Sequence, residues 1–326
     1  MTSSSPAPVE SSATASRPMP APGPRRPAIR STGLTKHYGA RAAVDGIDLE
    51  IPDGVIAGFV GPNGSGKTTT IRMLLALVSP SAGEAEVLGT SIRNPGDYLP
   101  RVGALIEGPA FYPTLSGRRN LEVLTTLGGI PRSRVEEVLD LVELRERAGD
   151  HVRTYSMGMK QRLGIAAAML PNPEVLILDE PANGLDPAGI LEMRRLLSRL
   201  RDQGITIFIS SHLLSEVEQV ADWILVLKDG RLLFQGPTAD LLSRRHGRLL
   251  VAAEHEAGLT TVATIAEVAG FKVARVNGHL EVDAPASFAA QLNRQAMAAG
   301  VTLVEISRSH ASLEETFLDL TNGETR

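Results

Sequence analysis

The chain has 326 residues, of which 43% are hydrophobic and 21% are charged, and its formal net charge is −4. This composition is typical of a globular protein with one large domain and a small one, and the negative charge gives no support for nucleic-acid binding. The lack of Cys excludes disulfides and Cys-ligated metals, and the sequence has no apolar run of about 18 residues that would predict a membrane span.

The N-terminal segment differs in composition from the rest of the chain. Residues 1–28 hold seven of the 21 prolines and six serines, with almost no large apolar side chain. Such a segment cannot bury enough surface to offset the entropy lost on ordering, so we predict a disordered tail. From Ile29, apolar and polar residues alternate over 29–32 and 44–51, which predicts half-buried antiparallel strands. We expect the first domain to cover residues 29–245.

A phosphate-binding loop is the strongest motif of this domain. It consists of Gly61, Pro62, Asn63, Gly64, Ser65, Gly66, Lys67 and Thr68, followed by Thr69. A predicted buried strand over 55–60 precedes the loop, and a predicted helix follows it. The glycines allow successive N–H groups to surround phosphate oxygens at the positive end of that helix. Lys67 adds a cation for the β- and γ-phosphates and the Thr68 hydroxyl can bind Mg²⁺, so the motif predicts nucleotide binding.

Strands are predicted again after a mainly helical stretch between about Tyr98 and Leu170. They cover 175–178, 205–209 and 223–227. The first two are short runs rich in branched residues, which is typical of a parallel sheet that is covered on both faces.

Two acidic residues follow the strand over 175–178. Asp179 and Glu180 stand at the carboxyl edge of the predicted sheet, where open α/β sheets bind their ligands. We expect Asp179 to hold Mg²⁺, usually through water, and Glu180 to polarise the attacking water. A solvated turn at the strand end is the alternative explanation, and the phosphate loop argues against it.

The end of the chain predicts a second, smaller domain over residues 246–326. Beyond Arg248 the order of predicted elements is β-α-β-β-α-β, which is typical of a ferredoxin-like module. A short helix over 313–320 is expected to close this module. No ionisable cluster in the segment resembles a catalytic site, so we expect an accessory α+β domain with a regulatory or dimer-supporting role.

The motifs of residues 29–243 resemble those of ATP-binding-cassette (ABC) ATPases. Asp186, which follows the two acids, is similar to the acid of the family's D-loop. His212, directly after a predicted strand, matches the switch histidine, and the resemblance implies that it contacts the γ-phosphate. Together with the strand-end acids and the phosphate loop, the resemblance implies that Glu180, His212 and Lys67 are the catalytic residues.

Two further segments extend the resemblance. Tyr38 matches the aromatic residue that stacks on adenine in the family, with a core or surface Tyr as the alternative. Ser156 and Gly158, in the segment Tyr155–Met159, occupy the place of the family signature, where a hydroxyl and a bare backbone at a helix N-terminus make an anion site. The resemblance implies that this site meets the γ-phosphate bound by the opposite subunit. The two methionines of the segment depart from the family pattern.

Glu107 is the most informative departure, because the family has Gln at this place. A carboxylate there can contact Mg²⁺ or its water more strongly than an amide, but it repels the γ-phosphate if it is unpaired. The alternative is a side chain that points to solvent. Glu107 and the segment 155–161 together resemble the bacitracin-resistance and lantibiotic-immunity branch of bacterial exporters.

The resemblance implies an α/β fold: a P-loop ABC cassette with a RecA-like core, an antiparallel β subdomain and an α-helical subdomain, joined to the small C-terminal ferredoxin-like module. It also implies ATP and Mg²⁺ as cofactors and a homodimer or paired cassette that closes head to tail. A separate polytopic membrane permease is expected to contact the chain near Phe111 and Tyr112, which otherwise belong to the helical core. Such a subunit is peripheral to the cytoplasmic face of a bacterial membrane, serves the export of a drug, antibiotic or peptide, and binds no nucleic acid.

Two other functions fit parts of the sequence. A soluble ABC ATPase acting in translation or DNA maintenance is the main alternative. Such proteins carry tandem cassettes, long coiled-coil insertions or zinc insertions, whereas this chain shows one cassette, no Cys and no long heptad insertion. A catalytically inactive regulatory cassette conflicts with the presence of Lys67, Asp179, Glu180 and His212.

Overall fold

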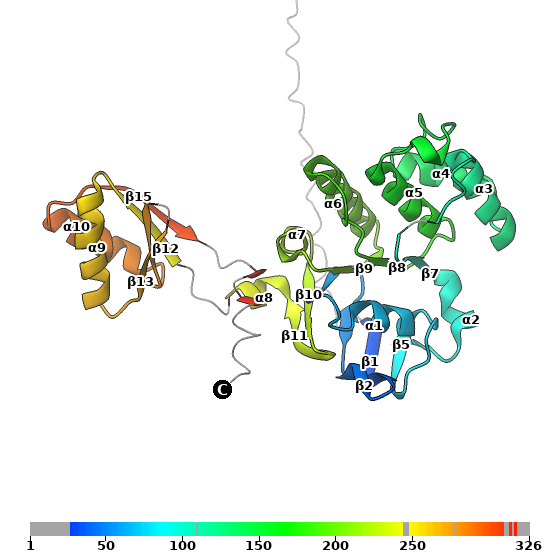
Figure 1. Ribbon diagram of the computed structural model, residues 1–326, viewed down its shortest axis with the longest axis horizontal. Helices are drawn as coiled ribbons and strands as arrows, with labels where there is room; N and C mark the ends of the chain where they lie inside the picture. Colours follow the sequence, from blue (N-terminus) through cyan, green and yellow to red (C-terminus); the bar gives the residue numbers. More distant parts are fainter. Residues whose placement is uncertain are drawn as a thin grey trace, which may run out of the picture.

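The computed structural model describes residues 27–108, 110–243, 248–276, 278–309, 313–314 and 316–317 (Figure 1). The tail predicted for residues 1–28 therefore lies outside the described residues, except at its end. There the prediction is wrong, because Pro27 pairs with Pro52 and the buried Ala28 belongs to the first strand. Pairing with a strand that is distant in sequence orders both residues, and composition alone cannot reveal such a contact.

A six-stranded sheet forms the centre of the N-terminal unit (residues 27–243), in the order β11-β10-β4-β9-β8-β7. Its strands are β4 (Ile56–Val60), β7 (Val102–Leu105), β8 (Val175–Asp179), β9 (Thr206–Ser211), β10 (Trp223–Lys228) and β11 (Arg231–Pro237). Neighbouring strands are parallel except for β11, which is antiparallel to β10. Every residue of β4, β8 and β9 is buried, as predicted for a parallel sheet covered on both faces.

Antiparallel strands cover one side of this unit, as predicted for the residues ahead of the phosphate loop. They are β1 (Pro27–Tyr38), β2 (Arg41–Ile47), β3 (Glu50–Pro52), β5 (Ala82–Val87) and β6 (Thr90–Ser91). The helices are α1 (Lys67–Leu74), α2 (Pro95–Tyr98), α3 (Gly117–Gly128), α4 (Ser133–Leu141), α5 (Met157–Met169), α6 (Pro187–Asp202), α7 (Leu214–Glu218) and α8 (Thr238–Ser243). The strand β7 interrupts the region that was expected to be mainly helical, because it is too short to show a period and is held by parallel pairing with β8.

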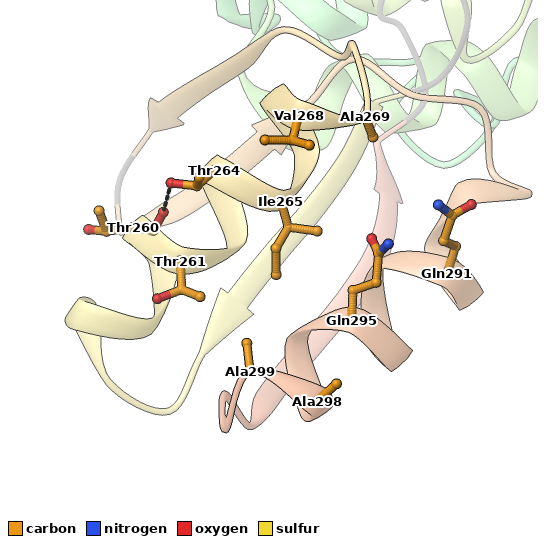
Figure 2. Close-up of a pocket in the computed structure, with 10 residues that line it drawn as sticks. All are labelled: Thr260, Thr261, Thr264, Ile265, Val268, Ala269, Gln291, Gln295, Ala298 and Ala299. Carbon is orange, nitrogen blue, oxygen red and sulfur yellow. Dashed lines mark hydrogen bonds between the residues drawn. The ribbon is translucent and has the colours of Figure 1, made fainter.

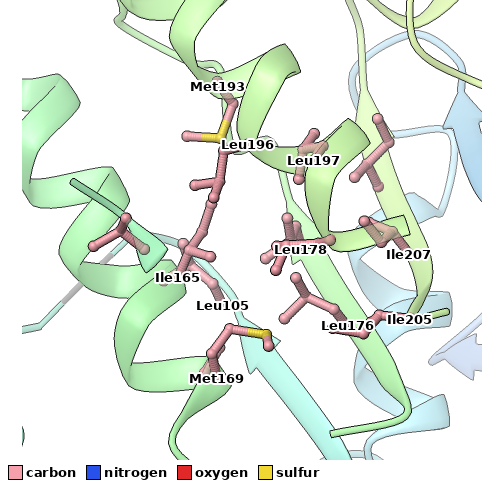
Figure 3. Packing of buried hydrophobic residues seen from close by; sticks show 14 of the residues in the cluster. Leu105, Ile165, Met169, Leu176, Leu178, Met193, Leu196, Leu197, Ile205 and Ile207 are labelled. Carbon is pink, nitrogen blue, oxygen red and sulfur yellow. The ribbon is translucent and has the colours of Figure 1, made fainter. Parts of the chain in front are cut away.

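The central strands separate two hydrophobic cores, because successive side chains of a strand point to opposite faces. Leu176 and Leu178 of β8 pack with Ile207 toward α5 and α6 (Figure 3). Ile177 and Phe208 belong to the other core, with α1 and the antiparallel strands. This packing on both faces holds the carboxyl ends of the strands, where the functional side chains stand.

Tyr98 joins α2 to α1 inside the second core. Its hydroxyl donates a hydrogen bond to the Leu74 carbonyl at 2.8 Å, and burial raises the pKa of Tyr98 to about 12.

We expect Tyr98→Phe to lower the free energy of unfolding by about 1 kcal/mol, since one hydrogen bond is lost and the carbonyl stays buried. The folded-state pKa lies above the ordinary value of about 10, so this proton contributes stability below pH ~10 that is lost as the pH rises toward 12. Urea unfolding at pH 8 and pH 11 tests both statements, because the stability of the variant should fall less between these pH values.

The C-terminal module (residues 248–309) has the predicted β-α-β-β-α-β order. Its elements are β12 (Arg248–Ala253), α9 (Glu256–Val268), β13 (Val273–Val276), β14 (His279–Val282), α10 (Phe288–Ala298) and β15 (Leu303–Ser309). The strands form an antiparallel sheet in the order β13-β14-β12-β15, which is the ferredoxin-like order. The module has a hydrophobic core of its own, in which Leu249 and Val251 pack against Val262 and Leu292.

An open cavity of about 850 Å³ lies between α9 and α10 (Figure 2). Thr264 and Val268 line one side and Gln291 and Gln295 the other, and the lining side chains that the structure describes are uncharged. The Thr264 hydroxyl donates to the Thr260 carbonyl within α9 at 3.0 Å.

The described residues after β15 pack on the N-terminal unit. Leu313 is 1% exposed and belongs to the core around α5 and α6, and Phe317 packs against the same core. The Leu313 N–H donates to a carboxylate oxygen of Glu218, at the end of α7, at 2.9 Å. The prediction that a helix over 313–320 closes the module is wrong for its described residues, because Leu313 and Phe317, four positions apart, pack on the N-terminal unit instead. The rest of 313–320 lies outside the described residues.

We expect Leu313→Ala to lower the free energy of unfolding of the N-terminal unit by about 2–4 kcal/mol, because a fully buried Leu leaves a cavity. Glu314→Ala is the matched control, since this neighbouring side chain is exposed. Urea unfolding followed by Trp223 fluorescence reports on the N-terminal unit. Equal stability of the two variants would contradict this packing.

Candidate nucleotide-binding site

The loop 61–66 connects β4 to α1 with its backbone in close contact with neighbouring elements. A Cβ at Gly61 would lie 2.2 Å from the Leu227 carbonyl oxygen, so no side chain fits there. Gly66, at the N-cap of α1, has φ 110°, and a Cβ would lie 2.4 Å from the Ala43 carbonyl oxygen. Both glycines are therefore required by the geometry of the loop, which presents backbone N–H groups at the N-terminus of α1.

Lys67 turns back into the loop. Its Nζ donates to the carbonyls of Gly61 at 2.8 Å and Pro62 at 3.3 Å, and lies 3.7 Å from a Glu180 carboxylate oxygen. Burial lowers the pKa of the Lys67 ammonium, and the carboxylates of Glu180 and Asp179 oppose that shift. The hydroxyl of Ser65 is also buried and has no hydrogen-bond partner among the described residues. A buried cation and an unpaired hydroxyl in one loop fit an anionic ligand such as phosphate.

Asp179 links the phosphate loop to the sheet. One carboxylate oxygen accepts from the Thr68 hydroxyl at 2.9 Å, and the other accepts from the hydroxyl of Ser210. Ser210 lies directly opposite Asp179 in the parallel pair β8–β9. Hydroxyl and carboxylate oxygens are ligands that Mg²⁺ prefers, so Thr68 and Asp179 fit this cation.

Glu180 and His212 form a second pair at the same sheet edge. The His212 Nδ1 lies 2.8 Å from a Glu180 carboxylate oxygen, and the Glu180 N–H donates to the Ser210 hydroxyl at 3.0 Å. Glu180 has φ 52°, a left-handed conformation that costs a non-glycine residue roughly 1 kcal/mol. The carboxylate is thus held between Lys67 on one side and His212 on the other.

Glu107 occupies a corresponding place on the neighbouring strand. Leu105 of β7 lies opposite Leu178 of β8, so Glu107 and Glu180 each stand two positions beyond a paired residue. Both line a cavity of about 600 Å³ together with Asp179. The Glu107 carboxylate is bound by Arg72 of α1, and among the described residues no group of three His, Cys, Asp or Glu side chains could hold a metal ion. Glu107 as a metal ligand therefore stays a prediction.

Ser156, Gly158 and Asp186 stand apart from the phosphate loop. Ser156 is the N-cap of α5 and accepts from the Met159 N–H at 3.2 Å, and Asp186 is the N-cap of α6 and accepts from the Gly189 N–H at 3.0 Å. No hydrogen bond within residues 27–243, as far as they are described, joins them to residues 61–68. In this structure both side chains cap their own helices, and the first turn of α5 lines the cavity of Glu107 through Met157 and Lys160.

The predicted aromatic contacts differ from one another. Tyr38, at the end of β1, is 50% exposed, with the Lys36 ammonium over its ring at 5.3 Å from the centre, so the side chain is accessible for stacking. Phe111 packs against the core around α5, whereas Tyr112 is 62% exposed. The two expectations for this pair, a contact with a permease and a place in the helical core, therefore divide between its members. Phe111 is a core residue, and Tyr112 is available at the surface.

Sequence reasoning missed Ser210 and Arg72. Ser210 carries a signal, because two serines end the strand that neighbours the strand of Asp179. Arg72 lies four residues after Thr68 on α1 and therefore on the same helix face, but only the fold shows which acid it meets.

Residues 44–183 match the sequence profile of the ABC transporter family. The bacitracin transport ATP-binding protein of Bacillus licheniformis is 40% identical over 302 residues, which cover 91% of this chain and 98% of that protein. A lantibiotic transport ATP-binding protein of Streptococcus pyogenes is 39% identical and covers 64% of this chain, with 90% of its own length matched.

Among solved structures, cbiO1 of Clostridium perfringens, part of an ABC transporter complex, has a similar fold. The TM-score is 0.63 at 24% identity, over 76% of this chain and 98% of that one. No helix among the described residues is long and apolar enough to cross a bilayer. The chain carries the phosphate loop and the strand-end acids, and the bacitracin and lantibiotic relatives match it at about 40% identity over at least 90% of their own length. It therefore belongs to the ATP-binding proteins of ABC transporters, in the branch of the bacitracin and lantibiotic transport proteins.

Proposed function

We propose that this chain hydrolyses ATP with Mg²⁺ and thereby energises a separate membrane permease. The observation that carries the proposal is Glu180, whose carboxylate is held between Lys67 and His212 beside the phosphate loop. A carboxylate anchored in this way is placed to accept a proton from water directed at the γ-phosphate. His212 keeps that carboxylate oriented and stands ready to contact the γ-phosphate itself.

The phosphate loop binds ATP through backbone N–H groups and Lys67. The Lys67 ammonium exchanges the neutral carbonyls of Gly61 and Pro62 for negatively charged β- and γ-phosphate oxygens. Ser65 supplies its unpaired hydroxyl to the same phosphates. Tyr38 stacks on the adenine with its exposed side chain.

Thr68 and Asp179 are the residues that would hold Mg²⁺. When bound, this ion neutralises charge on the β- and γ-phosphates. Ser210 donates to the second oxygen of Asp179 and so fixes the direction in which the carboxylate points.

A second cassette completes the site. The N-termini of α5 and α6 carry Ser156, Gly158 and Asp186, and no hydrogen bond among the described residues joins these three to the phosphate loop. We propose that they meet the γ-phosphate bound by the partner in a head-to-tail homodimer or paired cassette, so that ATP closes two sites and hydrolysis reopens them.

The remaining surfaces connect the ATPase to transport. The exposed Tyr112, two residues after Ala110 in the lining of the Glu107 cavity, is the proposed contact for a polytopic permease on the cytoplasmic face of a bacterial membrane. Since the relatives carry bacitracin and lantibiotic transport in their names, the proposed cargo is an antibiotic, drug or peptide that is exported. We propose a cassette over 29–245 and an accessory domain that begins at 246, with the residues around Leu313 assigned to the cassette core on which they pack.

Two measurements test this function. The purified full-length protein should hydrolyse ATP only with Mg²⁺, and tagged protein from detergent-solubilised cells should retain a polytopic membrane protein. Recovery of ribosomes or DNA in place of a membrane protein would support a soluble ATPase instead. Absence of turnover even with the copurified permease would support a regulatory cassette.

A further inference from the structure

The ion pair between Arg72 and Glu107 is the starting point, because it involves the most informative departure from the family pattern. Its side chains are 36% and 63% exposed. An exposed pair of this kind contributes little to folding stability, on the order of 0–1 kcal/mol. Its position at the nucleotide site therefore matters more than its contribution to the fold.

The backbone fixes where Glu107 stands. It follows β7 with φ 57°, and Glu180 follows β8 with φ 52°, so both residues leave the sheet edge in the same left-handed conformation. Such a conformation in a non-glycine residue is retained where the surrounding structure requires it. The result is that Glu107, Asp179 and Glu180 line one cavity with three carboxylates.

Arg72 stands on the same helix as Thr68, one of the residues that would hold Mg²⁺. It lies four residues after Thr68 on the same face of α1, which places it roughly 6 Å farther along the helix axis. The Glu107 carboxylate is thus paired with the Arg72 guanidinium, while the Thr68 hydroxyl is paired with Asp179. Arg72 also neutralises a charge that would otherwise face the incoming triphosphate, as Lys67 does for Glu180.

We propose that Arg72 is a positioning residue that competes with Mg²⁺ for Glu107. Before nucleotide binds, Arg72 holds the carboxylate and removes its repulsion of the γ-phosphate. Glu107 released from Arg72 would be a further carboxylate ligand for Mg²⁺ beside Thr68 and Asp179, so the departure from Gln would make nucleotide binding sensitive to the Mg²⁺ concentration. This inference rests on the proposed nucleotide function.

The test measures binding of a non-hydrolysable ATP analogue by calorimetry, with excess EDTA and across a Mg²⁺ titration. Arg72→Gln should weaken binding in EDTA about fivefold, because Glu107 is left unpaired. Mg²⁺ should increase the affinity for the analogue, and the same variant should reach half of that increase at a several-fold lower Mg²⁺ concentration. The reason is that Glu107 is already free of Arg72. Arg72→Lys should restore both values toward those of the unaltered protein.

Two comparisons test whether the effect is specific to the pair of Arg72 and Glu107. Arg101→Gln is the matched control, because Arg101 binds Glu174 in a pair of similar exposure outside the cavity, and it should leave both values unchanged. In Glu107→Gln protein, Arg72→Gln should no longer shift the Mg²⁺ requirement. An equal shift with and without the Glu107 carboxylate, or no shift at all, overturns the inference. If the unaltered protein binds no nucleotide under any condition, the proposed function itself fails.

Discussion

Glu180→Gln is expected to lower the turnover number for ATP about 10²- to 10⁴-fold while the protein still binds ATP with Mg²⁺. The amide keeps the size of the side chain and can keep the contact to His212 Nδ1, which lies 2.8 Å from the carboxylate in the unaltered protein. It cannot accept the proton of the attacking water. Because binding continues and reopening requires hydrolysis, closed dimers should accumulate, and size-exclusion chromatography with ATP measures them.

Glu174→Gln is the matched control for this variant. Glu174 directly precedes the same strand at its opposite end and binds Arg101 at 2.6 Å, so the substitution removes an equal charge far from the sheet edge of the site. Its turnover number should equal that of the unaltered protein. Retained hydrolysis in Glu180→Gln protein would exclude Glu180 as the general base.

Two inactive variants should restore activity when they are mixed. Lys67→Ala removes the loop cation, and Gly158→Asp places a carboxylate at the proposed anion site of α5, so each alone should lose about 10²-fold or more in turnover. In a head-to-tail dimer of the two, one site combines the intact loop of one chain with the intact signature segment of the other. Random mixing should therefore recover up to about a quarter of the unaltered turnover per chain. ATP turnover of refolded one-to-one mixtures measures this recovery.

The design depends on Gly158→Asp leaving the fold intact. A Cβ at Gly158 would come no closer than 3.8 Å to a neighbour, the side chain of Leu185, so the position has room. Gly149→Asp serves as control, because Gly149 is exposed with nothing within 4 Å and lies outside the anion site. Mixtures that stay inactive, although both proteins fold and pair, would mean that each site is built within one chain.

The sequence sufficed for the parts of the site that depend on local chemistry. The phosphate loop could be predicted because glycines at Gly61 and Gly66 are the only residues that fit the backbone approaches seen there. Asp179 and Glu180 could be predicted because a buried strand ending in acids places them at a ligand-binding edge. The ferredoxin-like order of the module followed from alternating short elements.

What could not be predicted depends on contacts between distant segments. Ser210 binds Asp179 because β8 and β9 pair in one register, and Arg72 meets Glu107 because β7 lies at the edge of the sheet next to β8. The strand β7 itself is too short to be recognised without its partner. Pairing of this kind is decided by tertiary structure, where local propensity has little weight.

The hydrogen bond from Leu313 to Glu218 changes how the accessory module should be studied. The polypeptide leaves the cassette after α8 and returns to it at Leu313, which makes the module an insertion and the cassette discontinuous in sequence. A stop codon placed after α8 would remove core side chains along with the module, and any defect would have two causes. An excision that joins the end of α8 to Leu313 through a flexible linker separates them, since it deletes the module and leaves the cassette whole.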